Sequence, residues 1–108
     1  MAAIRPGITA AEADKAQRDV MTRAGYGDHF LHRTAYGLGI AYPPHWDEGA
    51  IMSLKPGNER LLQPNMAFHL VTALYFYAEA VVVISETIRV TETGCEKMTN
   101  FPRKLIIK

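Results

Sequence analysis

The residues with the clearest chemical potential lie between His29 and Glu48, in the run HFLHRTAYGLGIAYPPHWDE. This run combines histidines, tyrosines, glycines and a proline pair with Trp46, the single tryptophan of the chain. Such a mixture is typical of a shaped polar pocket rather than of a hydrophobic core. Within it, His32 is a candidate general acid or base, because the free pKa of imidazole lies near neutrality. The alternative is a loop histidine bonded to a backbone carbonyl.

Three aromatic or histidine side chains each allow a binding role and a structural role. Tyr36 can orient a substrate through its hydroxyl, or it can be a packed strand tyrosine. Trp46 can offer its ring face to a cyclic or cationic substrate, or it can cover the core. His69 lies in an apolar strand, where it is either a substrate contact or a core histidine with its hydrogen bonds satisfied.

Glu86 is a carboxylate inside the otherwise apolar segment VVVISETIRV. A carboxylate in such surroundings must be paired, solvated or protonated. One interpretation is a site base or an anchor for the substrate. The other is an ion pair with Arg89 or a charge at a strand edge. Cys95 has no sign of an activated environment and is expected to be inert.

The sequence predicts a helix from Thr9 to Arg23, ahead of the candidate site residues. Thr9 with Glu12 three residues later forms a capping-box pattern. Gly25 and Gly27 are expected to end the helix, because glycine readily adopts the left-handed conformation. The apolar positions predict a buried stripe made of Ile8, Ala13, Ala16, Val20 and Ala24.

The rest of the chain predicts strands. β-branched and aromatic residues favour strands near 36–41, at 66–77, at 80–90 and at 105–107. Turn signals stand at Lys55-Pro56-Gly57-Asn58 and Thr93-Gly94. The predicted fold class is therefore α+β, with the N-terminal helix packed on a mainly antiparallel sheet.

The composition limits the class of protein. The 108 residues suit one small domain with a single core. A net charge of +1 without any basic run argues against nucleic-acid binding. The N-terminus lacks the apolar core of a signal peptide, and no apolar stretch is long enough to span a bilayer. We therefore expect a cytoplasmic protein that binds neither nucleic acid nor membrane.

Four segments together resemble the pita-bread hydrolases, which include methionine aminopeptidase, aminopeptidase P, prolidase, creatinase and ectoine hydrolase. The segments are RPGITAAEAD, AGYGDHFLHRTAYGLGI, LLQPNMAFHLVTALY and ISETIRVTETGCEKMT. Within the second segment and its continuation, HRTAYGLGIAYPPHW is most similar to ectoine-hydrolase-like members. The resemblance implies that residues 1–108 are the C-terminal half of one pita-bread catalytic domain, with the first half absent.

The resemblance also implies where the site lies. Tyr36 stands where peptidase members have a metal-binding histidine, Val71 stands at the first metal-binding glutamate, and Glu86 is matched to the second. One carboxylate and one histidine cannot hold a two-metal centre, so we expect no metal cofactor. The implied catalytic residues are His32 and Glu86. The implied substrate contacts are Tyr36, Trp46, His69 and Tyr75.

These observations leave three functions open. The first is a metal-independent hydrolase that cleaves a C–N bond in a small nitrogenous substrate and is inactive as this chain alone. The second is a metal-dependent Xaa-Pro peptidase whose missing ligands come from another chain. The third is a non-catalytic binding domain. Because half of a pita-bread domain leaves an apolar face uncovered, we expect self-association or a partner chain that supplies the missing half.

Overall fold

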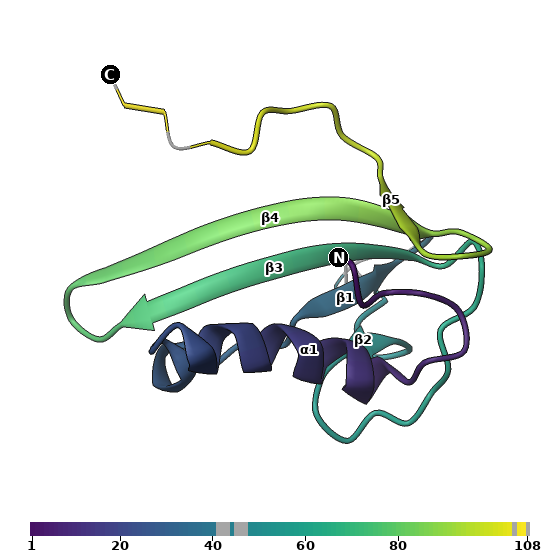
Figure 1. Ribbon diagram of the computed structural model, residues 1–108, viewed down its shortest axis with the longest axis horizontal. Coiled ribbons are helices and arrows are strands. Elements are labelled where there is room, and N and C mark those ends of the chain that lie inside the picture. Colours follow the sequence, from purple (N-terminus) through teal and green to yellow (C-terminus); the bar gives the residue numbers. More distant parts are fainter. Residues whose placement is uncertain (41–43, 45–47, 105, 108) are drawn as a thin grey trace.

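The computed structural model describes residues 1–40, 44, 48–104 and 106–107, and in them the chain forms one helix packed on one sheet. Figure 1 shows helix α1 lying along the long hairpin of β3 and β4, and the C-terminal segment running back beside β4. Neighbouring strands are antiparallel, in the order β2-β1-β3-β4-β5. The predicted α+β class is confirmed. The elements are α1 (Ala10–Arg23), the 3-10 helix η1 (Gly27–His29), β1 (Ala35–Leu38), β2 (Ser53–Leu54), β3 (Ala67–Phe76), β4 (Ala80–Val90) and β5 (Cys95–Lys97).

Helix α1 begins and ends where the sequence predicts. The amide of Glu12 donates to the Thr9 hydroxyl at 3.1 Å, and the amide of Thr9 donates to the Glu12 carboxylate at 2.7 Å. The bond from the Thr9 amide holds the pKa of Glu12 below its ordinary value. At the other end Gly25 has a φ of +83°, where a side chain would be strained.

The buried stripe of α1 differs from the predicted one. Val20 is 49% exposed and Ala24 is exposed as well. The buried residues of the helix are Ala10, Ala13 and Asp14, which lie on one face within its first two turns. The N-terminal half of the helix therefore covers the core. Relative to the predicted orientation, the helix is turned so that Asp14 contacts the segment before β1. The apolar positions alone could not show this rotation.

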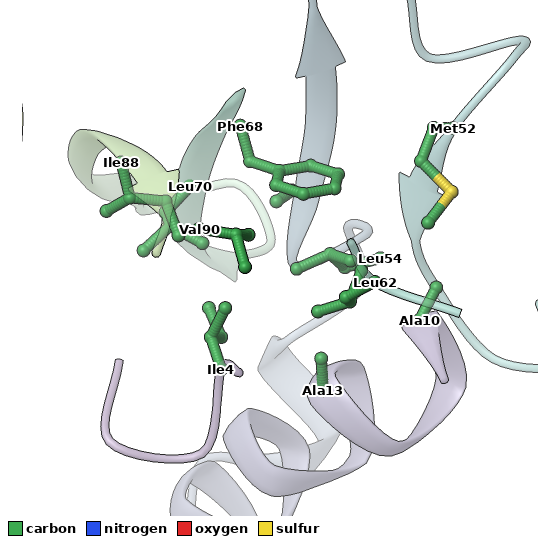
Figure 2. Packing of buried hydrophobic residues seen from close by; sticks show 11 residues of the cluster. Ile4, Ala10, Ala13, Met52, Leu54, Leu62, Phe68, Leu70, Ile88 and Val90 are labelled. Atoms are coloured by element: carbon green, nitrogen blue, oxygen red, sulfur yellow. The ribbon is translucent and has the colours of Figure 1, made fainter. Parts of the chain in front are cut away.

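The core lies between α1 and one face of the sheet (Figure 2). Phe68 and Leu70 of β3 and Ile88 and Val90 of β4 point into it. Removing a large buried side chain such as Phe68 costs about 3–5 kcal/mol through lost burial and the cavity left behind. Further members of the cluster are Ile4, Ala10, Ala13, Ala35, Met52, Leu54 and Leu62.

The hairpin of β3 and β4 confirms the two long strands expected at 66–77 and 80–90. Its ladder runs from Ala67 opposite Arg89 to Phe76 opposite Ala80. The turn between them includes Ala78, which has a φ of +58°. Beyond the core, four successive residues of β4, Val81 to Ile84, are each more than half exposed.

Two strand predictions need correction. Ile106 and Ile107 are not in a strand, and Leu105 lies outside the described residues. The last strand is instead β5, which follows the turn where the Thr91 amide donates to the Gly94 carbonyl at 2.9 Å. Past Met98, the side chains of Thr99 and Arg103 bond to Glu86 of β4. The strand expected near 36–41 is β1, which is shorter, and Ala41 lies outside the described residues.

Candidate functional site

The strand register divides the sheet residues between two faces. Tyr36 pairs with His69, and His69 pairs with Thr87. Directly paired residues share a face, and neighbours along a strand alternate. Because Phe68 and Leu70 face the core under α1, these three residues lie on the other side of the sheet. We call this side the distal face, defined by Tyr36, His69, Val71, Tyr75, Ser85 and Thr87.

Tyr36 and His69 pack against each other on the distal face. Their ring centroids are 5.3 Å apart, and the Arg33 guanidinium lies 4.9 Å above the tyrosine ring. Only 6% of Tyr36 is exposed. A ring nitrogen of His69, Nδ1, lies 3.2 Å from the Thr87 hydroxyl. Tyr36 is therefore a packed strand tyrosine whose ring helps to fix the orientation of the half-buried His69.

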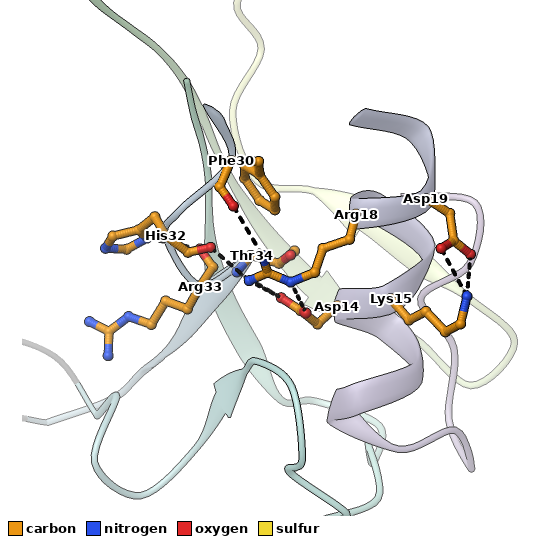
Figure 3. A network of polar contacts seen from close by, with 8 residues as sticks. All are labelled: Asp14, Lys15, Arg18, Asp19, Phe30, His32, Arg33 and Thr34. Carbon is orange, nitrogen blue, oxygen red and sulfur yellow. Dashed lines mark hydrogen bonds and ion pairs between the residues drawn. The ribbon is translucent and has the colours of Figure 1, made fainter. Parts of the chain in front are cut away.

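His32 and Tyr75 meet at a shallow hollow of about 160 Å³, which they line together with Leu31. Nδ1 of His32 lies 2.8 Å from the backbone oxygen of Arg33. Because a carbonyl oxygen can only accept, Nδ1 carries the proton of the neutral ring and Nε2 offers a lone pair. Figure 3 shows the side chains of His32 and Arg33 pointing away from α1. The lone pair of His32 is thus available for proton transfer on the side remote from the helix.

Asp14 and Arg18 of α1 hold the segment that carries His32 (Figure 3). Arg18 Nε donates to Asp14 at 2.6 Å, and its two terminal nitrogens donate to the carbonyls of Phe30 at 3.0 Å and His32 at 2.9 Å. The Thr34 amide donates to the same carboxylate at 3.2 Å. Asp14 is 1% exposed, so this network is the polar part of the interior.

The Asp14–Arg18 pair is not among the site residues predicted from the sequence. A signal was present, because Asp14 and Arg18 are four residues apart and such pairs face each other on a helix. The same spacing occurs at Lys15 and Asp19, whose ion pair of 2.7 Å is exposed to solvent. Spacing alone therefore does not tell the buried pair from the exposed one.

Glu86 lies apart from the other candidates. It pairs with Leu70, so it belongs to the face that α1 covers, next to the core. The Thr99 hydroxyl donates to its carboxylate, and Arg103 approaches it to 2.8 Å. The Thr99 bond first and Arg103 second hold the pKa of Glu86 below its ordinary value. The structure therefore does not bring Glu86 together with His32, Tyr36 or His69.

On the distal face, the neighbour of Glu86 that faces the candidates is Ser85, which lies opposite Val71. The predicted alternative for Glu86, an ion pair with Arg89, is not what the structure shows, because Arg89 pairs with Glu96 at 2.7 Å. Trp46 lies outside the described residues. Burial raises the pKa of the Cys95 thiol, which is the opposite of activation.

The donor atoms near Tyr36 do not fit a divalent metal centre. Within the described ranges, no group of three or more histidine, cysteine, aspartate or glutamate side chains is arranged to hold an ion. The distal face presents imidazole and hydroxyl groups there, whereas hard divalent ions need several carboxylate oxygens. No helix in the described part of the chain is long and apolar enough to cross a bilayer.

Comparison with known proteins agrees with this fold. Residues 1–92 match the model of metallopeptidase family M24. The chain is 38% identical to the probable dipeptidase PepE of Mycobacterium tuberculosis over 105 residues, which are 97% of the chain and 26% of that protein. It is also 38% identical to the ectoine hydrolase of Halomonas elongata over 104 residues, 96% of the chain and 25% of that enzyme.

A solved structure shares the arrangement of helix and strands. The Xaa-Pro dipeptidase from Bacillus anthracis superposes with a TM-score of 0.85 at 34% identity, over 97% of this chain and 28% of its own. The chain thus spans about a quarter of the length of the relatives that it matches.

Proposed function

Because the chain belongs to metallopeptidase family M24 and has the pita-bread fold of its prolidase relatives, we propose that it forms one wall of a hydrolase site. In this proposal residues 1–108 correspond to the C-terminal half of the catalytic domain. The observation that carries the proposal is that two pairs of polar side chains lie on the side of the sheet away from α1: His32 with Tyr75 around one hollow, and Tyr36 packed against His69 farther along β3.

The reaction proposed is metal-independent cleavage of a C–N bond in a small nitrogenous substrate. Nε2 of His32 accepts a proton from the water molecule that attacks the carbon atom, and it returns this proton to the leaving nitrogen. His69, oriented by Tyr36 and Thr87, donates a hydrogen bond to the substrate. Tyr75 forms the apolar side of the hollow beside His32.

Glu86 has a different role in this proposal from the one that the resemblance implied. Its carboxylate is bound by Thr99 and Arg103, and it lies on the opposite side of the sheet from His69. We propose that it anchors the C-terminal segment to β4. The metal-free state and the cytoplasmic location remain predictions.

A second function is favoured by the names of two relatives, a probable dipeptidase and an Xaa-Pro dipeptidase. In that case the protein acts on dipeptides with a metal whose remaining ligands come from another chain or chain segment. The side chains at 36, 71 and 85 argue against it, because tyrosine, valine and serine are poor ligands for hard ions. A non-catalytic binding domain is the third possibility, and it predicts no turnover in any context.

Exchange of the matching segment between relatives tests these functions. One chimera replaces the matching quarter of the Halomonas elongata ectoine hydrolase with this chain, and the other does the same in the Bacillus anthracis Xaa-Pro dipeptidase. Both are assayed on the substrate named for the parent, ectoine or an Xaa-Pro dipeptide, with added manganese and with a chelator.

We expect the ectoine hydrolase chimera to turn over ectoine equally with and without the chelator. We expect the dipeptidase chimera to be folded but inactive. His32→Gln in the active chimera lowers kcat by about 10²–10⁴-fold if His32 transfers the proton. Manganese-dependent hydrolysis of the dipeptide by the second chimera would instead establish the metal-dependent function. If both chimeras fold and neither is active, the remaining function is that of a non-catalytic binding domain.

A further inference from the structure

The outer edge of β4 is open along half of its length. β5 pairs with β4 only at Ile88, Arg89 and Val90. From Ala80 to Glu86, β4 has β3 on one side, and no described strand pairs with its other side. Such an edge presents unpaired N–H and C=O groups that can pair with another chain.

The hydrogen-bond pattern identifies which residues of β4 point to this edge. The Val71 amide donates to the Thr34 carbonyl beside β1 at 2.9 Å, so the even-numbered residues of β3 face β4. Their partners in β4 are also even-numbered, as in Leu74 opposite Val82. The odd-numbered residues of β4 therefore point outward. Consistent with this, the Thr87 carbonyl accepts from the Met98 amide at 2.9 Å.

Three residues thus offer outward backbone groups on the open edge: Val81, Val83 and Ser85. Their neighbours in β4 from Val81 to Ile84 are all apolar. Val81 to Ile84 are between 51% and 68% exposed, on both faces of the strand. A run of β-branched residues without alternation is typical of a strand covered on both sides.

We propose that a second copy of this chain pairs with this edge in antiparallel orientation about a two-fold axis through Val83. The outward residues are placed symmetrically around Val83, so an antiparallel copy faces each with another outward residue. Val83 lies opposite Val83 of the second copy, and Val81 lies opposite its Ser85. A shift by two residues puts Val81 opposite Thr87, whose carbonyl already accepts from Met98, or Ser85 opposite Glu79, whose amide already donates to the Phe76 carbonyl.

The charges next to the edge fit this register. In it Glu86 lies opposite Ala80 of the second copy, and Glu79 lies opposite Thr87, so no like charges are opposed. The carboxylate of Glu86 is already bound by Arg103 at 2.8 Å. Glu79 and Glu86 stand at the two ends of the edge, but neither faces the other copy's carboxylate directly, and Arg103 compensates the charge of Glu86.

The C-terminal segment completes the surface. Together with β4 it borders an apolar groove of about 550 Å³. Phe101 and Ile106 line this groove and are 66% and 61% exposed. In the proposed dimer the paired strand of the second copy lies in this groove, between β4 and these two side chains. Because each copy uses the same edge, the contact is closed by two-fold symmetry and does not propagate into a filament.

Cysteine crosslinking of the whole chain tests the register, in a Cys95→Ser background. Val83→Cys places two thiols across the axis, with Cα atoms about 5.5 Å apart, which a disulfide can bridge. We expect a covalent dimer after mild oxidation. Val81→Cys alone is the matched control, because it faces Ser85 and should not crosslink. The double variant Val81→Cys, Ser85→Cys should crosslink again.

Sedimentation of the uncrosslinked chain tests the contact itself. We expect dimers at about 100 µM, and at least a tenfold weaker dimer for Val83→Lys, which puts two like charges on the axis. Val20→Lys, an equal change of charge on exposed α1, should leave the dimer unchanged. A monomeric wild-type chain, or equal crosslinking of Val81→Cys and Val83→Cys, would overturn the proposal. Neither readout depends on the proposed hydrolase activity.

Discussion

His32 owes its position to two side chains of α1. Arg18 donates to the carbonyls on either side of Leu31, and Asp14 holds Arg18 and the Thr34 amide. A buried carboxylate is costly unless it is paired and hydrogen-bonded. Here the whole carboxylate is used, so the cost is offset and the direction of the segment from Phe30 to Thr34 is fixed. The orientation of the candidate general base is thus decided within the helix.

We predict that Asp14→Ala destabilises the protein by about 3 kcal/mol, because it leaves the partly buried Arg18 guanidinium without its counter-charge and removes one of the two acceptors of the Thr34 amide. The figure is at the lower end for a buried pair, since the Arg18 side chain is 29% exposed. Chemical denaturation measures the loss. Asp19→Ala removes the exposed partner of Lys15 and should cost only about 0.5 kcal/mol. Equal losses for the two variants would contradict the structural role of Asp14.

At the scale of elements, the register of the β3–β4 hairpin decides which residues can act together. Phe76 lies opposite Ala80 across a turn of Tyr77, Ala78 and Glu79. That turn puts Val71 opposite Ser85 and leaves Glu86 on the other face. A turn shorter by one residue would shift the pairing and bring Glu86 to the distal face.

This register predicts how a metal site could be built. Glutamates at 71 and 85 would lie directly opposite each other, with Cβ atoms about 4.5–5.5 Å apart. We expect the triple variant Tyr36→His, Val71→Glu, Ser85→Glu to bind Co²⁺ at least about 30-fold more tightly than wild type by titration calorimetry. The double variant Tyr36→His, Val71→Glu, which would have to rely on Glu86, should gain little. Equal affinities of the double and triple variants would show that Glu86 reaches the distal face.

Local signals explain why part of this fold could be predicted. The capping box at Thr9 and the two long strands depend on neighbouring residues, and their bounds were predicted to within a residue or so. The face of Glu86 could not be predicted, because it depends on the length of a turn without glycine or proline. The buried Asp14 carboxylate accepts from the Thr34 amide, which another segment supplies. The face of a residue is a tertiary property, whereas the start of a helix is a local one.

Docking of the C-terminal segment should depend on pH. The folded-state pKa of Glu86 is lowered by the Thr99 hydroxyl and then by Arg103. The ionised Glu86 therefore stabilises the docked segment at pH values above its unfolded pKa of about 4.3. This stabilisation is lost as the pH falls through the lower, folded-state pKa. We expect the amide resonances of Thr99 and Arg103 to shift together below about pH 4.3. Glu86→Gln should give the acid spectrum at neutral pH, and an unchanged spectrum would contradict the anchor role.

For the whole molecule, association and stability are linked. The residues that β3 and β4 contribute to the core cluster lie far from the hairpin turn, whereas Val81 to Ile84 near the turn are exposed, and in the proposed dimer the second copy covers them. A protein that unfolds from a dimer becomes more stable with concentration. We expect Tm to rise by about 3 °C for each tenfold increase in protein concentration. Val83→Lys should have a Tm that does not change with concentration, and scanning calorimetry at several concentrations measures both.

Backbone hydrogen bonds join the N-terminal segment around Gly7 to the segment around Leu62 in the middle of the chain. Gly7 and Ala10 donate their amides to the carbonyls of Leu62 and Arg60, and the Leu62 amide donates to the Ile8 carbonyl. These bonds join residues about fifty positions apart in the sequence, and closing such a loop is slow compared with zipping a hairpin. During synthesis the bonds that join the start of the chain to Arg60 and Leu62 can form only after Leu62 has been added. The hairpin of β3 and β4 closes only a short turn, so we expect it to form before these long-range bonds do.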